Sequence, residues 1–138
     1  SEVDYISDAW FVRGTREILT AMSKTSADTF MYVFTRNLRD PSERAPHAME
    51  LRYVFQSLPD DAPPMDQRIS DLMSDYWVMF AKSGDPNQEG LPVWPTYDPE
   101  RQEYQTLGAE VRPGSEFRRQ QLDALDHYFR TTYDGARQ

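Results

Sequence analysis

The chain has 138 residues, of which 38% are hydrophobic and 13% aromatic, which is enough apolar material for one packed domain and argues against disorder. Its formal net charge of −8 repels phosphate backbones and anionic lipid headgroups, so nucleic acid and membrane surfaces are not expected partners. The sequence has no cysteine, which excludes disulfides, thiolate metal sites and a cysteine nucleophile.

The first elements are a predicted helix and a predicted buried strand. Residues 8–24 have helical spacing, and Asp8 is the expected N-cap. Residues 29–35 form a nearly continuous apolar and aromatic run, typical of a strand covered on both faces, as in a parallel sheet. A buried helical turn is the alternative for this run. The apolar positions on one face of the first helix are Phe11, Ile18, Leu19 and Met22.

The middle of the chain predicts a loop followed by two helices. Residues 36–46 are polar and contain two prolines, so we expect a loop. Helical spacing returns over residues 48–58 and, more clearly, over residues 66–82, where Asp66 is the expected N-cap. The apolar stripe of the second helix is more typical of a core than of a substrate pocket, and it contains Ile69, Leu72, Met73, Tyr76, Trp77, Phe80 and Ala81.

The last third of the chain adds little further sheet. Residues 84–100 are rich in turn-forming residues, residues 103–107 predict a short strand, and residues 115–133 predict a final helix. One good central strand is too little for a self-contained sheet, because both of its edges would carry unpaired backbone groups. We therefore predict an α/β fold that is mostly helical, with one buried core strand and a short later strand. We also expect this chain to be part of a larger folded domain.

Two histidines are the candidates for chemistry. His127 lies inside the final predicted helix and is interpreted as a partly exposed helix residue. His47 follows the predicted core strand after a loop and precedes a helix, and in open α/β sheets functional residues gather beyond the carboxyl ends of strands. From the residues alone, a structural role for His47 stays open. Two distant histidines without cysteines do not favour a zinc site, and the chain contains no G-x-S-x-G nucleophile motif.

Five segments together resemble one family. Arg-Ala-Pro-His-Ala-Met-Glu-Leu at 44–51 resembles the G-A-x-H-x-x-E-L segment of type B carboxylesterases, the family of cholinesterases and para-nitrobenzyl esterases. One departure is visible, Arg44 in place of the glycine three residues before the histidine. Because Pro46 directly precedes the histidine, we expect a stiffer loop. The other matching segments, in the family's order around it, are the helix start at 7–11, the core strand at 30–34, Tyr-Trp-Val-Met-Phe-Ala-Lys-Ser-Gly-Asp-Pro-Asn at 76–87 and Trp-Pro-Thr-Tyr at 94–97.

The resemblance implies a role for His47. It would be the histidine of a catalytic triad, taking the serine proton during attack on the ester carbonyl and returning it to the leaving alcohol. The triad order in this fold is serine, acid, histidine, so the serine, the acid and the oxyanion hole would lie upstream. Glu50 also matches a family position, and we interpret it as structural. The resemblance implies no cofactor and no metal.

By the same resemblance, residues 1–138 would be the C-terminal part of a single α/β-hydrolase domain, incomplete on its own. The expected partners are a small-molecule carboxylic ester and the missing N-terminal part of the same fold. Alone, the chain is expected to be inactive. Because its strand edges are exposed, it is also expected to self-associate, to swap domains or to unfold partly. The alternative is a non-catalytic acidic domain, derived from an esterase, that binds a protein partner.

Overall fold

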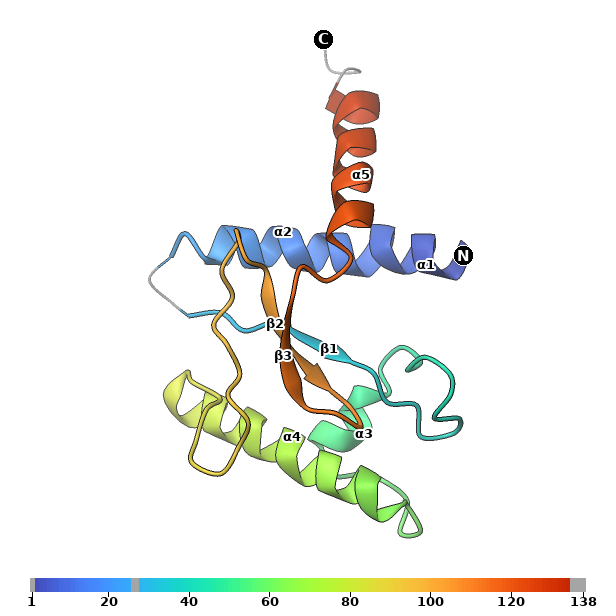
Figure 1. Ribbon diagram of the computed structural model, residues 1–138, viewed down its shortest axis with the longest axis vertical. Helices are drawn as coiled ribbons and strands as arrows, with labels where there is room; N and C mark the ends of the chain where they lie inside the picture. Colours follow the sequence, from blue (N-terminus) through green and yellow to red (C-terminus); the bar gives the residue numbers. More distant parts are fainter. Residues whose placement is uncertain (1, 26–27, 135–138) are drawn as a thin grey trace.

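The computed structural model describes residues 2–25 and 28–134, which form three layers (Figure 1). A long N-terminal helix crosses one side of a small twisted sheet, and two further helices, α3 and α4, lie on the other side. The last helix, α5, runs away from the sheet at a steep angle to the first one. The arrangement is mostly helical, with both kinds of element present, as the sequence predicts.

The N-terminal helix starts earlier than predicted. It consists of α1 (Glu2–Ser7), a π-helical segment η1 (Asp8–Val12) and α2 (Arg13–Met22), which follow one another without a break. The assignment of Asp8 as N-cap is wrong, because Asp8 lies in mid-helix with no side-chain capping bond. Its carboxylate is buried and instead accepts a 2.6 Å hydrogen bond from Nη2 of Arg118.

The predicted core strand is present as β1 (Tyr32–Phe34), and its side chains are half-buried rather than buried. It pairs in parallel with β2 (Glu103–Leu107), the predicted later strand. Antiparallel to β2 runs β3 (Arg112–Ser115), which the sequence did not predict because Pro113 and Gly114 are unfavourable in strands. Gly114 lets the Tyr104 ring approach closely, since a Cβ at this position would lie 2.5 Å from that ring and force it to shift.

Helices α3 (Glu50–Val54) and α4 (Pro64–Ser83) cover the second face of the sheet. Proline at the first position suits the start of α4, and Gly84 ends it with a left-handed backbone (φ 80°) and a 2.8 Å bond from its amide to the carbonyl of Phe80. The prediction of Asp66 as N-cap is wrong: Pro63 holds that position. Helix α3 is shorter than the predicted 48–58.

The main core lies between α4 and the sheet. Trp94 is its centre: the indole is 4% exposed, and its Nε1 donates a 2.9 Å bond to the carbonyl of Met31. Aromatic rings surround it edge-on, including Tyr76 at 5.1 Å between ring centroids. The buried side chains of this core are Tyr53, Val54, Ile69, Met73, Tyr76, Trp94 and Leu107.

The final helix begins later than predicted. It consists of α5 (Arg119–Phe129) and the π-helical η2 (Arg130–Asp134), whereas the prediction started at residue 115. Ser115 instead ends β3, and Arg118 takes a left-handed backbone (φ 53°) that redirects the chain into the helix. Leu122 and Leu125 are the buried residues of α5.

Candidate active site

His47 is exposed and lies beyond the carboxyl end of β1, the place that the sequence predicts for it. Twelve residues separate it from the last residue of that strand, and α3 begins three residues later, at Glu50. Its imidazole stacks on the ring of Phe11 from the N-terminal helix, with 5.1 Å between centroids and 29° between planes. The ring is therefore accessible to a reacting group while one of its faces is supported.

The backbone next to His47 has an unusual conformation. Ala48 has φ 63°, in the left-handed region that residues with a Cβ rarely adopt. Such a conformation costs about 1 kcal/mol or more and persists only where the surroundings enforce it. The turn from the loop into α3 therefore depends on contacts on both sides of the histidine.

On the N-terminal side, a buried asparagine closes the loop. Asn37 is 3% exposed, and its Nδ2 donates a 3.0 Å bond to the carbonyl of Arg44. Its Oδ1 accepts bonds from the amides of Arg39 (3.0 Å) and Asp40 (3.2 Å). One side chain thus joins the two ends of the segment 37–44, and the segment ends three residues before His47.

On the other side, a buried ion pair joins three elements. Nε and Nη2 of Arg36 donate 2.7 Å bonds to the two carboxylate oxygens of Asp66, in α4. The hydroxyl of Tyr53, in α3, donates a 2.6 Å bond to the same carboxylate. Asp66 and Tyr53 are fully buried. The hydrogen bonds from Arg36 hold the pKa of Asp66 below its ordinary value, whereas burial and then the bond to Asp66 raise the pKa of Tyr53.

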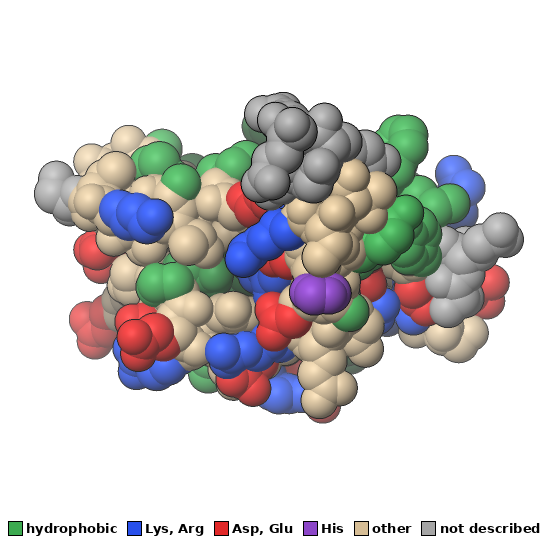
Figure 2. All heavy atoms as spheres, turned by 90° about the horizontal axis from the view of Figure 1, so that it is seen from above, with side chains coloured by type: hydrophobic (Ala, Val, Ile, Leu, Met, Phe, Trp, Pro, Cys, Tyr) green, Lys and Arg blue, Asp and Glu red, His purple; other side chains and the backbone are tan. Residues whose placement is uncertain are grey.

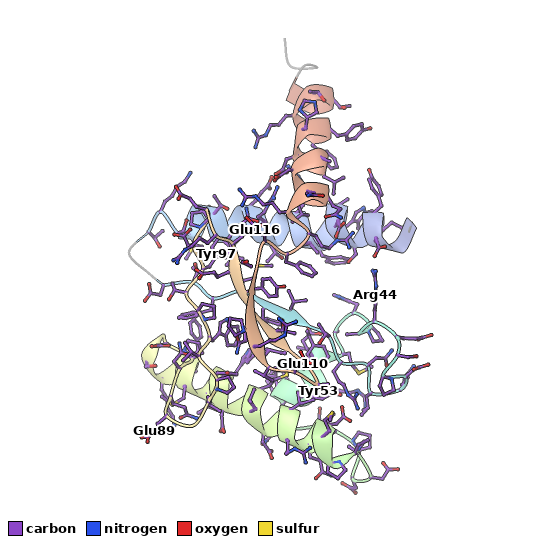
Figure 3. All side chains as sticks on the ribbon, viewed as in Figure 1. Arg44, Tyr53, Glu89, Tyr97, Glu110 and Glu116 are labelled. Carbon is purple, nitrogen blue, oxygen red and sulfur yellow. The ribbon has the colours of Figure 1, made fainter. Side chains whose placement is uncertain are left out.

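Arg44, the residue that departs from the family pattern, fastens the loop to the N-terminal helix. Its guanidinium forms an ion pair with Asp4 in α1. Figure 3 shows the Arg44 side chain extending from the loop toward that helix, while Tyr53 lies on the opposite side of the loop, in α3. The loop that carries His47 is therefore held from both layers of helices.

A hollow of about 570 Å³ lies beside this loop. The amide of Gln105 donates to the carbonyl of Met31, and the amide of Thr35 donates to that of Leu107, so these groups of β1 face β2. Backbone N–H and C=O groups of successive residues in a strand point to opposite sides, so those of Tyr32 and Phe34 point away from β2 and toward the hollow. Among the described residues, no strand pairs with β1 on that side. Other residues that line the hollow are Asp8, Phe11, Val12, Ala45 and Phe117.

The remaining candidates have structural environments. His127 is exposed on α5, as predicted for a helix residue. Glu50 starts α3, and its charge, after burial, raises the pKa of Tyr32. Trp77 packs against Trp94 in the core, as the apolar stripe predicted.

Membrane spans and metal clusters are both absent from the described part of the chain. No helix there is both long and apolar enough to cross a membrane. No group of three or more histidine, aspartate or glutamate side chains within residues 2–25 and 28–134 is arranged to hold a metal ion.

Sequence reasoning missed most of the residues around His47. Phe11 was assigned to the apolar face of a helix, and Asp66 to a cap. The polar pattern of residues 36–46 predicts a loop but does not single out Asn37, although asparagine side chains commonly bond the backbone two residues on and so close loops. The pairing of Arg36 with Asp66 spans 30 residues, and no local pattern indicates it.

Comparison with known proteins gives a consistent result. A family model described as the carboxylesterase family matches residues 2–125. Carboxylesterase 5A of Canis lupus familiaris is 27% identical over 139 residues, covering 89% of this chain. Carboxylesterase 1D of Rattus norvegicus is 33% identical over 119 residues, covering 79% of this chain. These alignments take in 24% and 20% of the two relatives, so the chain spans about a quarter or less of their length.

Solved structures agree with this assignment. A PNB esterase superposes with a TM-score of 0.81 at 28% sequence identity, covering 91% of this chain and 27% of that one. A carboxylesterase of Geobacillus stearothermophilus gives a TM-score of 0.68 at 30% identity, covering 83% of this chain and 25% of that one. The arrangement of helices and strands described above is therefore one that these esterases share over part of their length.

Proposed function

Because the chain belongs to the carboxylesterase family and its fold is a fragment of the α/β-hydrolase fold, we propose that it supplies the general base of a carboxylic ester hydrolase. His47 is the residue that performs this role. The observation that carries the proposal is the exposed imidazole beyond the carboxyl end of a parallel strand, within the segment that the family model matches.

In the proposed reaction, a serine hydroxyl attacks the carbonyl carbon of a small carboxylic ester. His47 accepts the serine proton as the bond forms, and then donates it to the departing alcohol. Water repeats the sequence on the acyl-enzyme, with His47 again taking and returning the proton. The serine, the acid that orients the imidazole and the oxyanion donors come from the preceding part of the same fold, and this chain supplies the C-terminal part.

Three features support a contact with more of that fold. The outer edge of β1 presents free backbone groups of Tyr32 and Phe34 to a hollow large enough for a short extended segment. The N-terminal helix exposes large apolar side chains, among them Trp10 at 77%. Exposed apolar area of this extent marks an interaction surface. The chain also spans only about a quarter of its relatives' length.

The experiment compares this chain with the product of its whole reading frame. A G-x-S-x-G motif in the few hundred residues upstream, and hydrolysis of para-nitrophenyl butyrate by the longer product, are the expected results. The 138-residue chain alone is expected to hydrolyse nothing above the buffer rate, because its sequence has no G-x-S-x-G motif to place a serine nucleophile. Turnover by the pure chain that depends on His47 contradicts this account. A start codon directly before residue 1 favours the alternative, an esterase-derived domain that binds a protein partner.

A further inference from the structure

We propose that Asn37 and the Arg36–Asp66–Tyr53 cluster are positioning residues for His47, which together fix the loop between β1 and α3 so that the imidazole stays stacked on Phe11. This inference rests on the proposed role of His47. It gives a positioning role to Asn37, Tyr53 and Asp66, which are buried polar side chains near the site.

The two groups tie the start of the loop to two different places. Arg36 and Asn37 are consecutive residues that follow β1 after Thr35, and both side chains turn inward instead of into solvent. Arg36 reaches α4, so the start of the loop is tied to the longest helix. Asn37 reaches the carbonyl of Arg44, so the far end of the loop is tied to its start.

Helix α3 connects the cluster to the C-terminal side of His47. Tyr53 joins α3 to the carboxylate that holds Arg36, and its carbonyl accepts a 2.7 Å bond from the hydroxyl of Ser70 in α4. With Arg44 fixed on one side and α3 on the other, only five residues, 45–49, remain between them. Ala48 spans part of that gap with its left-handed backbone, and the direction of the His47 side chain follows from it.

The geometry of the cluster suits positioning. Arg36 and Asp66 meet through two parallel bonds, a fork arrangement that fixes orientation as well as distance. Both acceptor sites of Asn37 Oδ1 are used by amides of the loop, and the amide nitrogen is used by a carbonyl of the same loop. A misplacement of a catalytic group by about 1 Å lowers a rate about 100-fold, so such fixation has a direct use in catalysis.

The test is an NMR measurement on the 138-residue chain. His127→Gln removes the second histidine, so that a single imidazole remains in a histidine-labelled sample. In this background we expect a nuclear Overhauser effect between the ring protons of His47 and Phe11, and His47 ring shifts displaced by the stacked aromatic ring. Asn37→Asp keeps the size and the acceptor oxygen but removes the donor to Arg44. It is expected to reduce the Overhauser effect at least fivefold and to return the His47 shifts toward free histidine.

Asp66→Asn is expected to have the same effect, because it weakens the bonds by which α4 holds Arg36 at the start of the loop. Two matched variants are the controls. Asn87→Asp makes the same change in an asparagine that closes another loop, by bonds of 2.7 and 3.0 Å to the backbone of Trp94. Asp71→Asn makes the same change at an exposed position of α4. Both controls are expected to leave the His47 signals unchanged.

Unchanged His47 signals in a folded Asn37→Asp chain overturn the inference, and so does the absence of the Overhauser effect before any loop substitution. If Asp66→Asn unfolds the chain, Tyr53→Phe replaces it, since that change removes one hydrogen bond and leaves the ion pair. The measurement uses no ester and no second chain. A failure of the positioning role is therefore distinguishable from a failure of His47 as a base, which only the activity assay reports.

Discussion

The two faces of the sheet are stabilised by different interactions. On the side of α3 and α4, aromatic and aliphatic side chains interlock around Trp94, and Tyr53, Met73 and Tyr76 are fully buried. On the other side, the buried apolar cluster is smaller, with Leu19, Met31 and Tyr97 at its centre, and α5 is joined to the N-terminal helix by several ion pairs. Arg16 pairs with Asp123 and Asp126, and Arg13 pairs with Asp126 and lies 4.8 Å above the ring of Phe129.

The contrast shows where the chain is complete and where it is open. Figure 2 views the α5 end and shows acidic and basic side chains together in the middle of this face, with hydrophobic side chains exposed beside them. The exposed apolar residues of the N-terminal helix are Tyr5, Ile6, Trp10, Phe11, Ile18 and Met22. The α4 side has the larger buried core, although Phe55 and Phe80 are exposed there, whereas the N-terminal helix exposes most of its large apolar side chains.

The largest expected difference in stability between the two sides comes from substituting one tryptophan on each side. Trp94→Ala is expected to lower the free energy of unfolding by about 3–5 kcal/mol, because it leaves a large cavity and removes the bond to Met31. Trp10→Ala, at a side chain 77% exposed, is expected to change it by less than about 0.5 kcal/mol. Urea unfolding followed by circular dichroism measures both. Similar losses for the two variants would contradict the division into a closed and an open side.

The buried ion pair on the closed side is expected to give the next largest loss of stability. Asp66→Asn leaves Arg36 buried without its counter-charge, and is expected to cost about 3 kcal/mol. Asp71→Asn, on the exposed side of the same helix, is expected to change stability by less than about 0.5 kcal/mol. Urea unfolding at pH 7 measures both variants, and equal costs would show that the pair contributes little.

The same pair predicts a pH dependence. The pKa of Asp66 is lowered from its ordinary value of 3.8, mainly by its bonds to Arg36. Its contribution is therefore fully present above pH 3.8 and is lost as the pH falls through the lowered pKa of the folded chain. We expect unfolding midpoints to fall more steeply below about pH 4 in the unmodified chain than in Asp66→Asn. Parallel curves for the two proteins would exclude a role for this carboxylate in acid stability.

On the side of the N-terminal helix, the ion pairs are expected to stabilise α5 against local unfolding. Asp126→Asn removes the charge that both Arg13 and Arg16 contact, and should speed amide hydrogen exchange in α5 about tenfold, equivalent to about 1.4 kcal/mol. Exchange in α4 should not change. Asp123→Asn is expected to have a smaller effect, because Asp123 is 59% exposed and Arg16 keeps its ion pair with Asp126. Faster exchange in both helices would show that the two sides unfold together.

The smallest of these effects concerns association. The exposed apolar face and the free edge of β1 predict that the isolated chain self-associates, which sedimentation velocity at several concentrations detects. Replacing Trp10 and Ile18 with glutamate should shift the distribution toward monomer without changing the melting temperature. A monodisperse monomer of the unmodified chain at all concentrations would contradict the prediction.

The sequence predicted the elements better than the contacts between them. Helix α4 and strand β2 follow from local periodicity, and the position of His47 beyond β1 follows from the order of elements. Strand β3 was missed because a Pro-Gly pair is unfavourable in strands, and only the nearby ring of Tyr104 explains the glycine. The roles of Asp8 and Asp66 were misassigned as caps for one physical reason. A carboxylate near an expected helix start looks like a cap, unless a distant arginine that neutralises it is known.

The proposed function depends on one imidazole, and one pair of variants of the longer reading-frame product tests it most directly. His47→Gln is expected to lower kcat for para-nitrophenyl butyrate at least about 1,000-fold with little change in KM, because the serine loses its proton acceptor. His127→Gln, at an exposed histidine of α5, is expected to leave kcat within about twofold of the unmodified enzyme. Retention of full activity by His47→Gln would contradict the account.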